Sequence, residues 1–308
     1  MTARNSIADS TADFPPAESP VPPRVRVQFG AMSHVGKVRE HNEDQYLIVR
    51  MKKTLEVLQE SLPAKEDPAV EHLDSYVFLV ADGIGGAEAG ERASAYVVQE
   101  AKKHLLFTAK WYFRLDDPDV EVRLRLLRES LEHMDRTLIE QAKQDPSLVG
   151  MGTTLTAAGS FGLDLFLVQV GDSRAYLFRE GRLEQLTRDH TLAQELINEG
   201  LLDPEEAKTD RTRHVLTNAI GGMPGVRGEV MQIRLNHGDR VLLCTDGLHD
   251  LVEHDRISEI VRLHPDPKAA SQALVDAALE LGGRDNITVV VADYATDEGP
   301  EQADSGRS

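Results

Sequence analysis

Aspartates at four distant places in the chain are the residues best suited to chemistry. Asp44 ends the run Arg39-Glu40-His41-Asn42-Glu43-Asp44, Asp82 begins the run Asp82-Gly83-Ile84-Gly85-Gly86, and Asp246 and Asp285 come much later. Carboxylates that gather without basic neighbours repel one another, and a divalent cation removes that cost. Oxygen ligands without clustered His or Cys favour Mg²⁺ or Mn²⁺. Because such ions activate water for attack on phosphorus, the pattern predicts metal-assisted phosphate hydrolysis.

These aspartates fall at the ends of predicted strands. Short apolar runs with β-branched or aromatic residues predict strands at Tyr76–Ala81, Leu165–Val170, Ala175–Phe178, Val241–Cys244 and Ile287–Ala292. Asp82, Asp172 and Asp246 follow apolar runs. Asp44 and Asp285 instead precede them. The two sets meet if the strands are antiparallel, because the end of one strand then lies beside the beginning of the next. We therefore expect antiparallel sheets with the site at one rim.

Three helical patterns lie between the strand groups. One has apolar residues at alternating steps of four and three, namely Val120, Leu124, Leu127, Leu131, Met134 and Leu138. A second is expected after Gly90, with one apolar face made of Ala93, Val97, Ala101 and Leu105. A third runs from Lys268 to Leu281 and stops at Gly282-Gly283. We expect these helices to pack on the outside of the sheets.

Composition excludes several classes of protein. The chain has 308 residues, 52 acidic against 34 basic, and a formal charge of −18, which predicts no affinity for nucleic acid or anionic membranes. No apolar run reaches the roughly 18 residues of a membrane span, and Met1 to Pro23 lacks the apolar centre of a secretory signal. The single cysteine, Cys244, allows neither an internal disulfide nor a cysteine-based zinc site. We expect a cytoplasmic protein.

One folded domain is expected, at residues 25–294. Residues 1–24 and 295–308 are rich in small, polar and acidic residues with no apolar period, so we expect two disordered tails. Lys52 to Leu73 is a polar insertion of mixed charge. No repeat or long linker divides the rest of the chain.

The run Asp82 to Ser94 resembles a signature of the metal-dependent protein phosphatases, the type 2C or PPM class, in its bacterial form. The resemblance continues in chain order over nearly all of residues 25–294. Its other segments are Arg39 with Asn42–Asp44, Gly150–Thr156, Val170–Tyr176, Leu216–Gly222, Cys244–Leu248 and Arg284–Thr288. The resemblance implies an α+β fold, a central β-sandwich of two antiparallel sheets flanked by α-helices. It also implies a protein serine/threonine phosphatase that uses two Mn²⁺ or Mg²⁺ ions and a metal-bridging water for in-line attack.

Site residues follow from the matched motifs. The resemblance makes Asp44, Asp82, Asp246 and Asp285 metal ligands, adds the Gly83 carbonyl, and gives Glu43 a role through a metal-bound water. It makes Arg39 the residue that grips the substrate phosphate, a task that suits a guanidinium fork, although a surface salt bridge is the plain alternative. Arg39, Asp44 and Asp246 are thus the expected catalytic residues.

Other residues have two readings. Asp172 is either a ligand of a third ion or part of a tight turn between strands. The segment from His190 to Gly222 corresponds to the flap beside the site in bacterial members, where substrate choice is decided.

Ile84 stands where many eukaryotic relatives have a histidine that protonates the leaving alcohol, which leaves the general acid unidentified. His34, His41 and His190 are near the motifs only in sequence, and surface roles are expected for them.

Two other hydrolase mechanisms fail on sequence. A cysteine phosphatase needs an arginine six positions after its cysteine, where this chain has Asp250, and a serine hydrolase lacks its Gly-x-Ser-x-Gly elbow. The remaining alternative is a catalytically inactive phosphatase-like binding or scaffold module. Loss of metal ligands would mark such a protein, yet all four matched aspartates are present. The expected partners are phosphorylated proteins, including a Ser/Thr protein kinase and its substrates.

Overall fold

The computed structural model describes residues 25–53, 73–112, 120–222 and 225–297. Residues 1–24 and 298–308, which include most of the expected tails, lie outside this range, as do residues 54–72 of the polar insertion. The last strand continues to Thr296, two residues past the expected boundary, because Thr296 pairs with Val25 of the first strand.

Two five-stranded antiparallel sheets form the centre of the described part. The first has the strand order β1-β12-β11-β8-β9, with β1 Val25–His34, β8 Arg174–Arg179, β9 Arg182–Gln185, β11 Arg240–Cys244 and β12 Ile287–Thr296. The second has the order β10-β7-β6-β3-β2, with β2 Gln45–Lys53, β3 Leu73–Ala81, β6 Leu155–Phe161, β7 Asp164–Val170 and β10 Glu229–Arg234. A short pair, β4 Gly83–Ile84 and β5 Gly152–Thr153, joins β3 to β6 at the rim.

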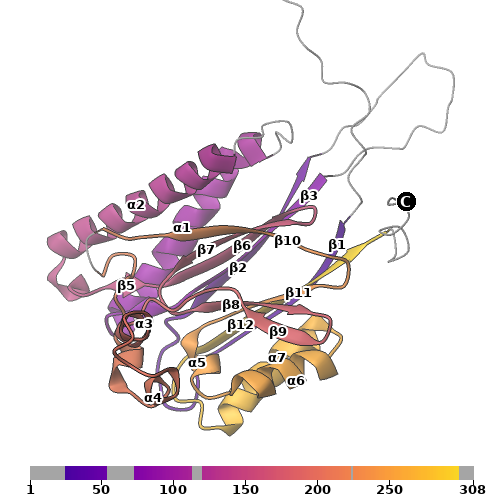
Figure 1. Cartoon of the computed structure of the whole chain (residues 1–308). Helices are drawn as coiled ribbons and strands as arrows, with labels where there is room; N and C mark the ends of the chain where they lie inside the picture. The colour runs from indigo at the N-terminus through magenta and orange to yellow at the C-terminus, as the bar shows by residue number, and fades with distance from the viewer. Residues whose placement is uncertain (1–24, 54–72, 113–119, 223–224, 298–308) are drawn as a thin grey trace, which may run out of the picture.

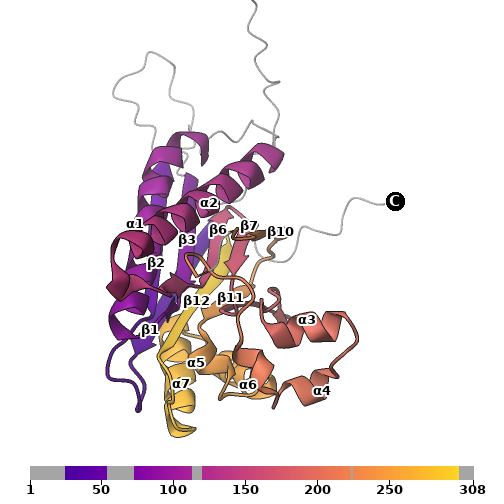
Figure 2. The same ribbon diagram turned by 90° about the vertical axis from the view of Figure 1, so that its left-hand side faces the viewer.

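Helices cover both outer faces of the sandwich. In Figure 1, α1 and α2 lie above the β2 sheet, while α6 and α7 lie below the β1 sheet. Figure 2 shows that α3 and α4 stand off to one side of these layers. The helices are α1 Ala87–Tyr112, α2 Val120–Gln144, α3 Leu192–Asn198, α4 Pro204–Ala207, α5 Asp246–His249, α6 His254–Leu263 and α7 Pro267–Glu280, with short 3-10 helices at Pro146–Leu148 and Arg211–His214. The expected α+β sandwich is confirmed.

Three apolar layers hold these elements together. Side chains of both sheets, including Phe78, Leu243 and Val290, fill the space between them. The alternate residues of the same strands point outward, so that Leu79 packs under α1 and α2 while Val289 packs against α7. This period of two is what allows a strand to be buried on both faces. Within the described residues, no helix combines the length and apolarity required to cross a membrane.

The helix expected after Gly90 in fact begins at Ala87, so Gly90 lies inside its first turn. Crowding explains why residue 90 is a glycine, because a Cβ there would lie 1.9 Å from Glu43 Oε2. A glycine within a helix lowers the stability of the helix. At position 90 only glycine leaves room for the Glu43 carboxylate. By contrast, the third helix, α7, ends at Glu280, one residue before the expected end.

Candidate metal centre

Antiparallel pairing brings the distant aspartates to one rim of the sandwich. Gln45 pairs with Ala81, so Asp44, just before β2, lies beside Asp82, just after β3. In the other sheet Cys244 pairs with Val289, which places the end of β11 beside the start of β12. The rim arrangement expected from the order of strands and aspartates is therefore what the structure contains.

The backbone of Asp82 is fixed by Thr153 at the end of β5 and by Thr154, the residue just before β6. Its N–H donates to Thr154 Oγ1 at 2.9 Å, and its carbonyl accepts from the Thr154 N–H at 2.9 Å and from Thr153 Oγ1 at 2.7 Å. The next residue, Gly83, has no room for a side chain, because a Cβ there would lie 2.3 Å from the Gly90 carbonyl oxygen. Asp82 and Gly83 are thus held in register by β5, β6 and the first turn of α1.

Asp44 is almost wholly buried, with 3% of its surface exposed. Its Oδ2 accepts a hydrogen bond of 2.8 Å from Thr245 Oγ1, which in turn accepts from the Thr288 N–H at 3.0 Å. Its other oxygen, Oδ1, is buried and has no hydrogen-bond partner among the described residues, and the same holds for Asp246 Oδ1. A buried carboxylate oxygen without a donor is costly, so both atoms are suited to a cation.

Glu43 is tied to the last motif by its backbone. Its N–H donates to Asn286 Oδ1 at 2.8 Å, and Asn286 Nδ2 donates to the carbonyls of Val35 and His41 at 2.9 Å each. Ser94 Oγ of α1 donates to the Glu43 carbonyl at 2.6 Å. Asn286 therefore fastens the loop that carries Arg39, Glu43 and Asp44 onto the start of β12. The sequence motifs contain Asn286, but its role was not predicted.

Arg39 contacts one of the candidate ligands. Its Nη2 donates to Asp285 Oδ2 at 2.7 Å, while about half of its side chain is exposed, 52% against 37% for Asp285. This hydrogen bond raises the pKa of Arg39, and burial opposes the rise. An exposed ion pair of this kind contributes little to the stability of the fold. A guanidinium has five N–H donors, so Arg39 can also donate to a ligand at the rim.

Asp250 belongs to this cluster and was missed by the sequence reasoning. It follows Asp246 by four residues across the short helix α5, a spacing that puts both carboxylates on one side. Carboxylate oxygens of Asp246 and Asp250 and a ring nitrogen of His214 all lie within 4.8 Å of one another. The Asp-x-x-x-Asp spacing was the available signal. Asp172, which is 7% exposed, lies close enough that its charge raises the pKa of Asp246.

The segment from His190 to Gly222, here called the flap, reaches this cluster. His214 Nδ1 lies 3.2 Å and Arg213 Nη2 lies 3.7 Å from Asp250 Oδ2. At the base of the flap, the His190 N–H donates to the Gly171 carbonyl at 3.0 Å, and His190 Nδ1 accepts from the Gly171 N–H at 3.1 Å. His190 is mostly buried rather than a surface residue, and it fixes the backbone just before Asp172.

Electrostatics confirm that the carboxylates are crowded. Burial raises the pKa of Asp44 to about 7, against hydrogen bonds from Thr288 and Thr245 that lower it. Burial, followed by repulsion from neighbouring aspartates, holds the pKa of Asp82 and Asp246 well above their usual range. Asp172 also has a pKa raised to about 7 by burial and by Asp189. Oxygen donors that resist ionisation until a cation arrives fit Mn²⁺ or Mg²⁺.

Comparison with known proteins supports this reading of the rim. The family description Protein phosphatase 2C matches residues 59–279. The chain is 40% identical over 267 residues to the serine/threonine protein phosphatase PstP of Mycobacterium tuberculosis, covering 87% of this chain but 45% of PstP, so it spans about half the length of that relative. It is 30% identical to the serine/threonine phosphatase stp of Listeria monocytogenes, covering 84% of this chain and 92% of that one.

A solved structure shows the same fold with metal bound. The catalytic domain of PstP in complex with two manganese ions superposes with a TM-score of 0.67 at 33% identity, over 88% of this chain and all of that one.

Proposed function

Because the chain belongs to the protein phosphatase 2C family, we propose that it removes phosphate from phosphoserine and phosphothreonine residues of other proteins. The observation that carries the proposal is the rim itself, where Asp44 and Asp246 each have a buried oxygen without a hydrogen-bond partner and both lie close enough to Asp82 to raise its pKa. Buried carboxylates without donors lower the stability of the fold when no cation is bound. A binding module that needs no metal gains nothing from this arrangement.

In this proposal the carboxylates of Asp44, Asp82, Asp246 and Asp285 hold two Mn²⁺ or Mg²⁺ ions. The Gly83 carbonyl is a further ligand, and Glu43 acts through a metal-bound water. When bound, the ions supply Lewis-acid charge and an activated water for in-line attack on phosphorus. A third ion is held beside Asp246 by Asp250 and His214, whose ligand atoms lie within 4.8 Å of one another and of Asp246, and Asp172 lies close enough to contribute its charge. The threonines and Asn286 fix the directions of these ligands through the hydrogen bonds described above.

Arg39 orients the substrate phosphate. Its guanidinium is fixed at one corner by Asp285 and leaves its other donors toward solvent, which suits two parallel hydrogen bonds to phosphate oxygens. Ile84 lies in β4 directly after Gly83 and has no proton to give. The proton for the leaving alcohol therefore comes from a metal-bound water or from a more distant residue.

Phosphate release from synthetic peptides tests the function. With Mn²⁺, peptides containing phosphothreonine or phosphoserine are expected to be hydrolysed, and excess chelator is expected to stop the reaction because the carboxylates alone activate no water. A phosphotyrosine peptide of the same sequence serves as the comparison for residue type. If the metal-loaded protein binds these peptides but never releases phosphate, the chain is the inactive binding module instead.

Replacing Arg39 tests its assigned role. Arg39→Ala is expected to weaken the binding of phosphorylated peptide and of inorganic phosphate by about 1.5 to 3 kcal/mol, the usual range for a charge-assisted hydrogen bond. Arg39→Lys is expected to recover only part of the loss, because an ammonium cannot present two parallel donors. Phosphate inhibition constants and calorimetric Mn²⁺ titrations measure the two effects separately. Mn²⁺ affinity is expected not to fall, because Arg39 binds the anion and not the metal.

Arg284→Ala is the matched control, since Arg284 is an exposed arginine next to Asp285. Unchanged phosphate inhibition in Arg39→Ala, with activity retained, would make Arg39 a surface residue and leave the phosphate to the metals.

The cellular setting completes the proposal. The similar proteins named above are bacterial serine/threonine phosphatases, so we place this chain in the bacterial cytoplasm, in signalling opposite a Ser/Thr protein kinase. The buried thiol of Cys244 suits a reducing compartment. Its substrates are then the phosphorylated kinase and the proteins that the kinase modifies.

A further inference from the structure

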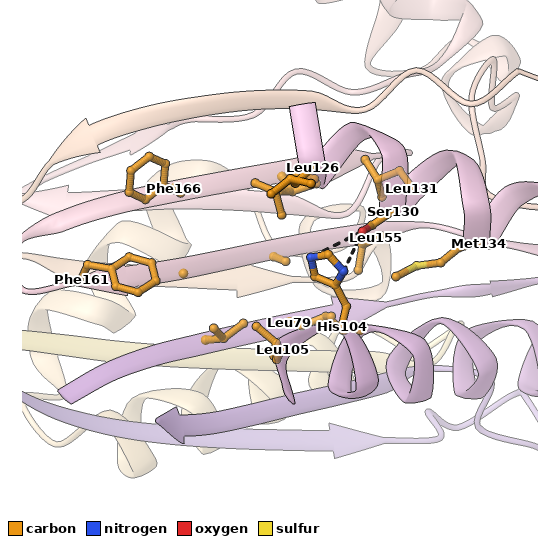
Figure 3. A pocket seen from close by; sticks show the side chains of 16 residues that line it. Leu79, His104, Leu105, Leu126, Ser130, Leu131, Met134, Leu155, Phe161 and Phe166 are labelled. Carbon is orange, nitrogen blue, oxygen red and sulfur yellow. Dashed lines mark hydrogen bonds between the residues drawn. The ribbon is translucent and has the colours of Figure 1, made fainter. Parts of the chain in front are cut away.

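A cavity of about 110 Å³ lies between the β2 sheet and the helices α1 and α2, away from the metal centre. Alternate residues of three adjacent strands form its floor, among them Leu79, Leu155 and Phe166, and α1 and α2 form its roof. Figure 3 shows these side chains around the space. Among the described residues that line it, His104 and Ser130 are polar and the others are apolar or glycine.

Small residues on the floor and roof leave this space open. Ala157 and Gly159 of β6 and Ala101 of α1 all line the cavity. A Cβ on Gly159 would meet only Val77 Cγ2, at 3.7 Å, so the strand has room for a side chain that the sequence does not supply. Gly159 also lacks the positive φ that would require glycine. The gap therefore follows from the choice of small residues and not from backbone strain.

The one polar point is a pair of side chains in the roof. Ser130 Oγ of α2 lies 2.8 Å from His104 Nδ1 of α1, and this contact is dashed in Figure 3. A hydroxyl has one donor and two acceptor lone pairs, so Ser130 retains an acceptor after bonding to His104. Engineered apolar cavities of about 150 Å³ take up benzene, so a mainly apolar space of this size suits one small ring.

Helix α1 connects the cavity to the metal centre. Its first two turns touch Glu43, since Gly90 in the first turn lies against the Glu43 carboxylate and Ser94 Oγ in the second turn donates to the Glu43 carbonyl. Ala101 and His104, two to three turns further along the same helix, line the cavity. A molecule that fills the cavity therefore packs against the helix that positions Glu43.

We propose that this cavity is an effector site for a small aromatic molecule of one ring that carries a single hydrogen-bond donor. The ring fills the space between Ala101 and Gly159, and the donor bonds to Ser130 Oγ. By holding α1 in place, the bound molecule favours the arrangement that binds the cation, and linkage requires that the cation favours the molecule equally.

The probes are 4-fluorophenol and fluorobenzene, which differ only in the hydroxyl group, followed by ¹⁹F NMR. Both are expected to bind saturably to the metal-free protein. Ala101→Leu is expected to weaken both by about tenfold or more, because the larger side chain occupies the space. Ala95→Leu, the same change in α1 at a position outside the cavity lining, is expected to bind like the wild type. Ser130→Ala is expected to weaken 4-fluorophenol by about three- to tenfold and leave fluorobenzene unchanged.

Coupling is measured by calorimetric Mn²⁺ titration with and without saturating 4-fluorophenol, and the fluorophenol is expected to tighten Mn²⁺ binding by about fivefold. The Ala101→Leu protein, if well folded by its thermal transition, is expected to lose this response. Absence of saturable binding, equal binding to Ala101→Leu and wild type, or an unchanged Mn²⁺ affinity would each overturn the proposal. None of these readouts depends on phosphatase activity, so the proposed function stands or falls separately.

Discussion

Asp246→Asn is expected to reduce turnover by about a thousandfold or more, because the cation charge held at this carboxylate lowers the barrier by several kcal/mol. The substitution preserves volume and removes one negative charge from the centre of the cluster. Asp246 is the first residue of α5 and has a buried oxygen without a donor. Steady-state hydrolysis of a phosphothreonine peptide at saturating Mn²⁺ measures the loss.

The same variant is expected to be more stable than the wild type when metal is absent. Burial, followed by repulsion from Asp172, Asp250, Asp285 and Asp44, raises the pKa of Asp246, so an amide that never ionises relieves the cluster and is expected to raise the melting temperature in chelator. Thermal unfolding in chelator, compared with Asp276→Asn at an exposed position of α7, tests this. Near-normal turnover would remove Asp246 from the site, and a lower melting temperature would make it a structural residue.

Stability of the metal-free protein is expected to fall as the pH rises from about 5 to 8. The pKa of Asp44 is raised to about 7 in the folded protein, against 3.8 for the ordinary side chain. A group with a raised folded pKa contributes stability below its unfolded pKa and loses it as the pH passes through the folded value. Asp172 shifts in the same direction for the same main reason, burial. The summed loss is on the order of a few kcal/mol.

Saturating Mn²⁺ is expected to reverse this trend, because cations bind the deprotonated carboxylates and their stabilisation grows with pH. Denaturant unfolding at pH 5 and pH 8, each in chelator and in Mn²⁺, gives the four free energies needed. Asp246→Asn should flatten the chelator curve. Metal-free stability that increases between pH 5 and pH 8 would contradict the description of the rim as a cluster of strained carboxylates.

Sequence alone predicted strands β3, β7, β8, β11 and β12, helices α1, α2 and α7, and a site at one rim, whereas β1, β2, β6, β9 and β10 were not predicted. Short apolar runs with β-branched or aromatic residues indicated these strands, and an aspartate just before or just after a run indicated which strand end it occupies. Antiparallel pairing then predicted that Asp44, Asp82, Asp246 and Asp285 lie at one rim. In the structure Gln45 pairs with Ala81 and Cys244 with Val289, and Asp44, Asp246 and Asp285 all lie close enough to Asp82 for their charges to raise its pKa. These inferences succeed because side-chain alternation and strand direction are local properties of the chain.

Only the tertiary structure decided which other residues complete the site. His214 and Arg213 meet Asp250 because the flap folds back across α5, and no local period specifies where a loop of that length returns. Gly90 was taken as preceding a helix, since glycine disfavours helix interiors, but the nearby Glu43 carboxylate requires it inside the first turn. The cavity beneath Ala101 likewise depends on how far two helices stand from a sheet. Contacts between distant segments, not propensity, determine each of these features.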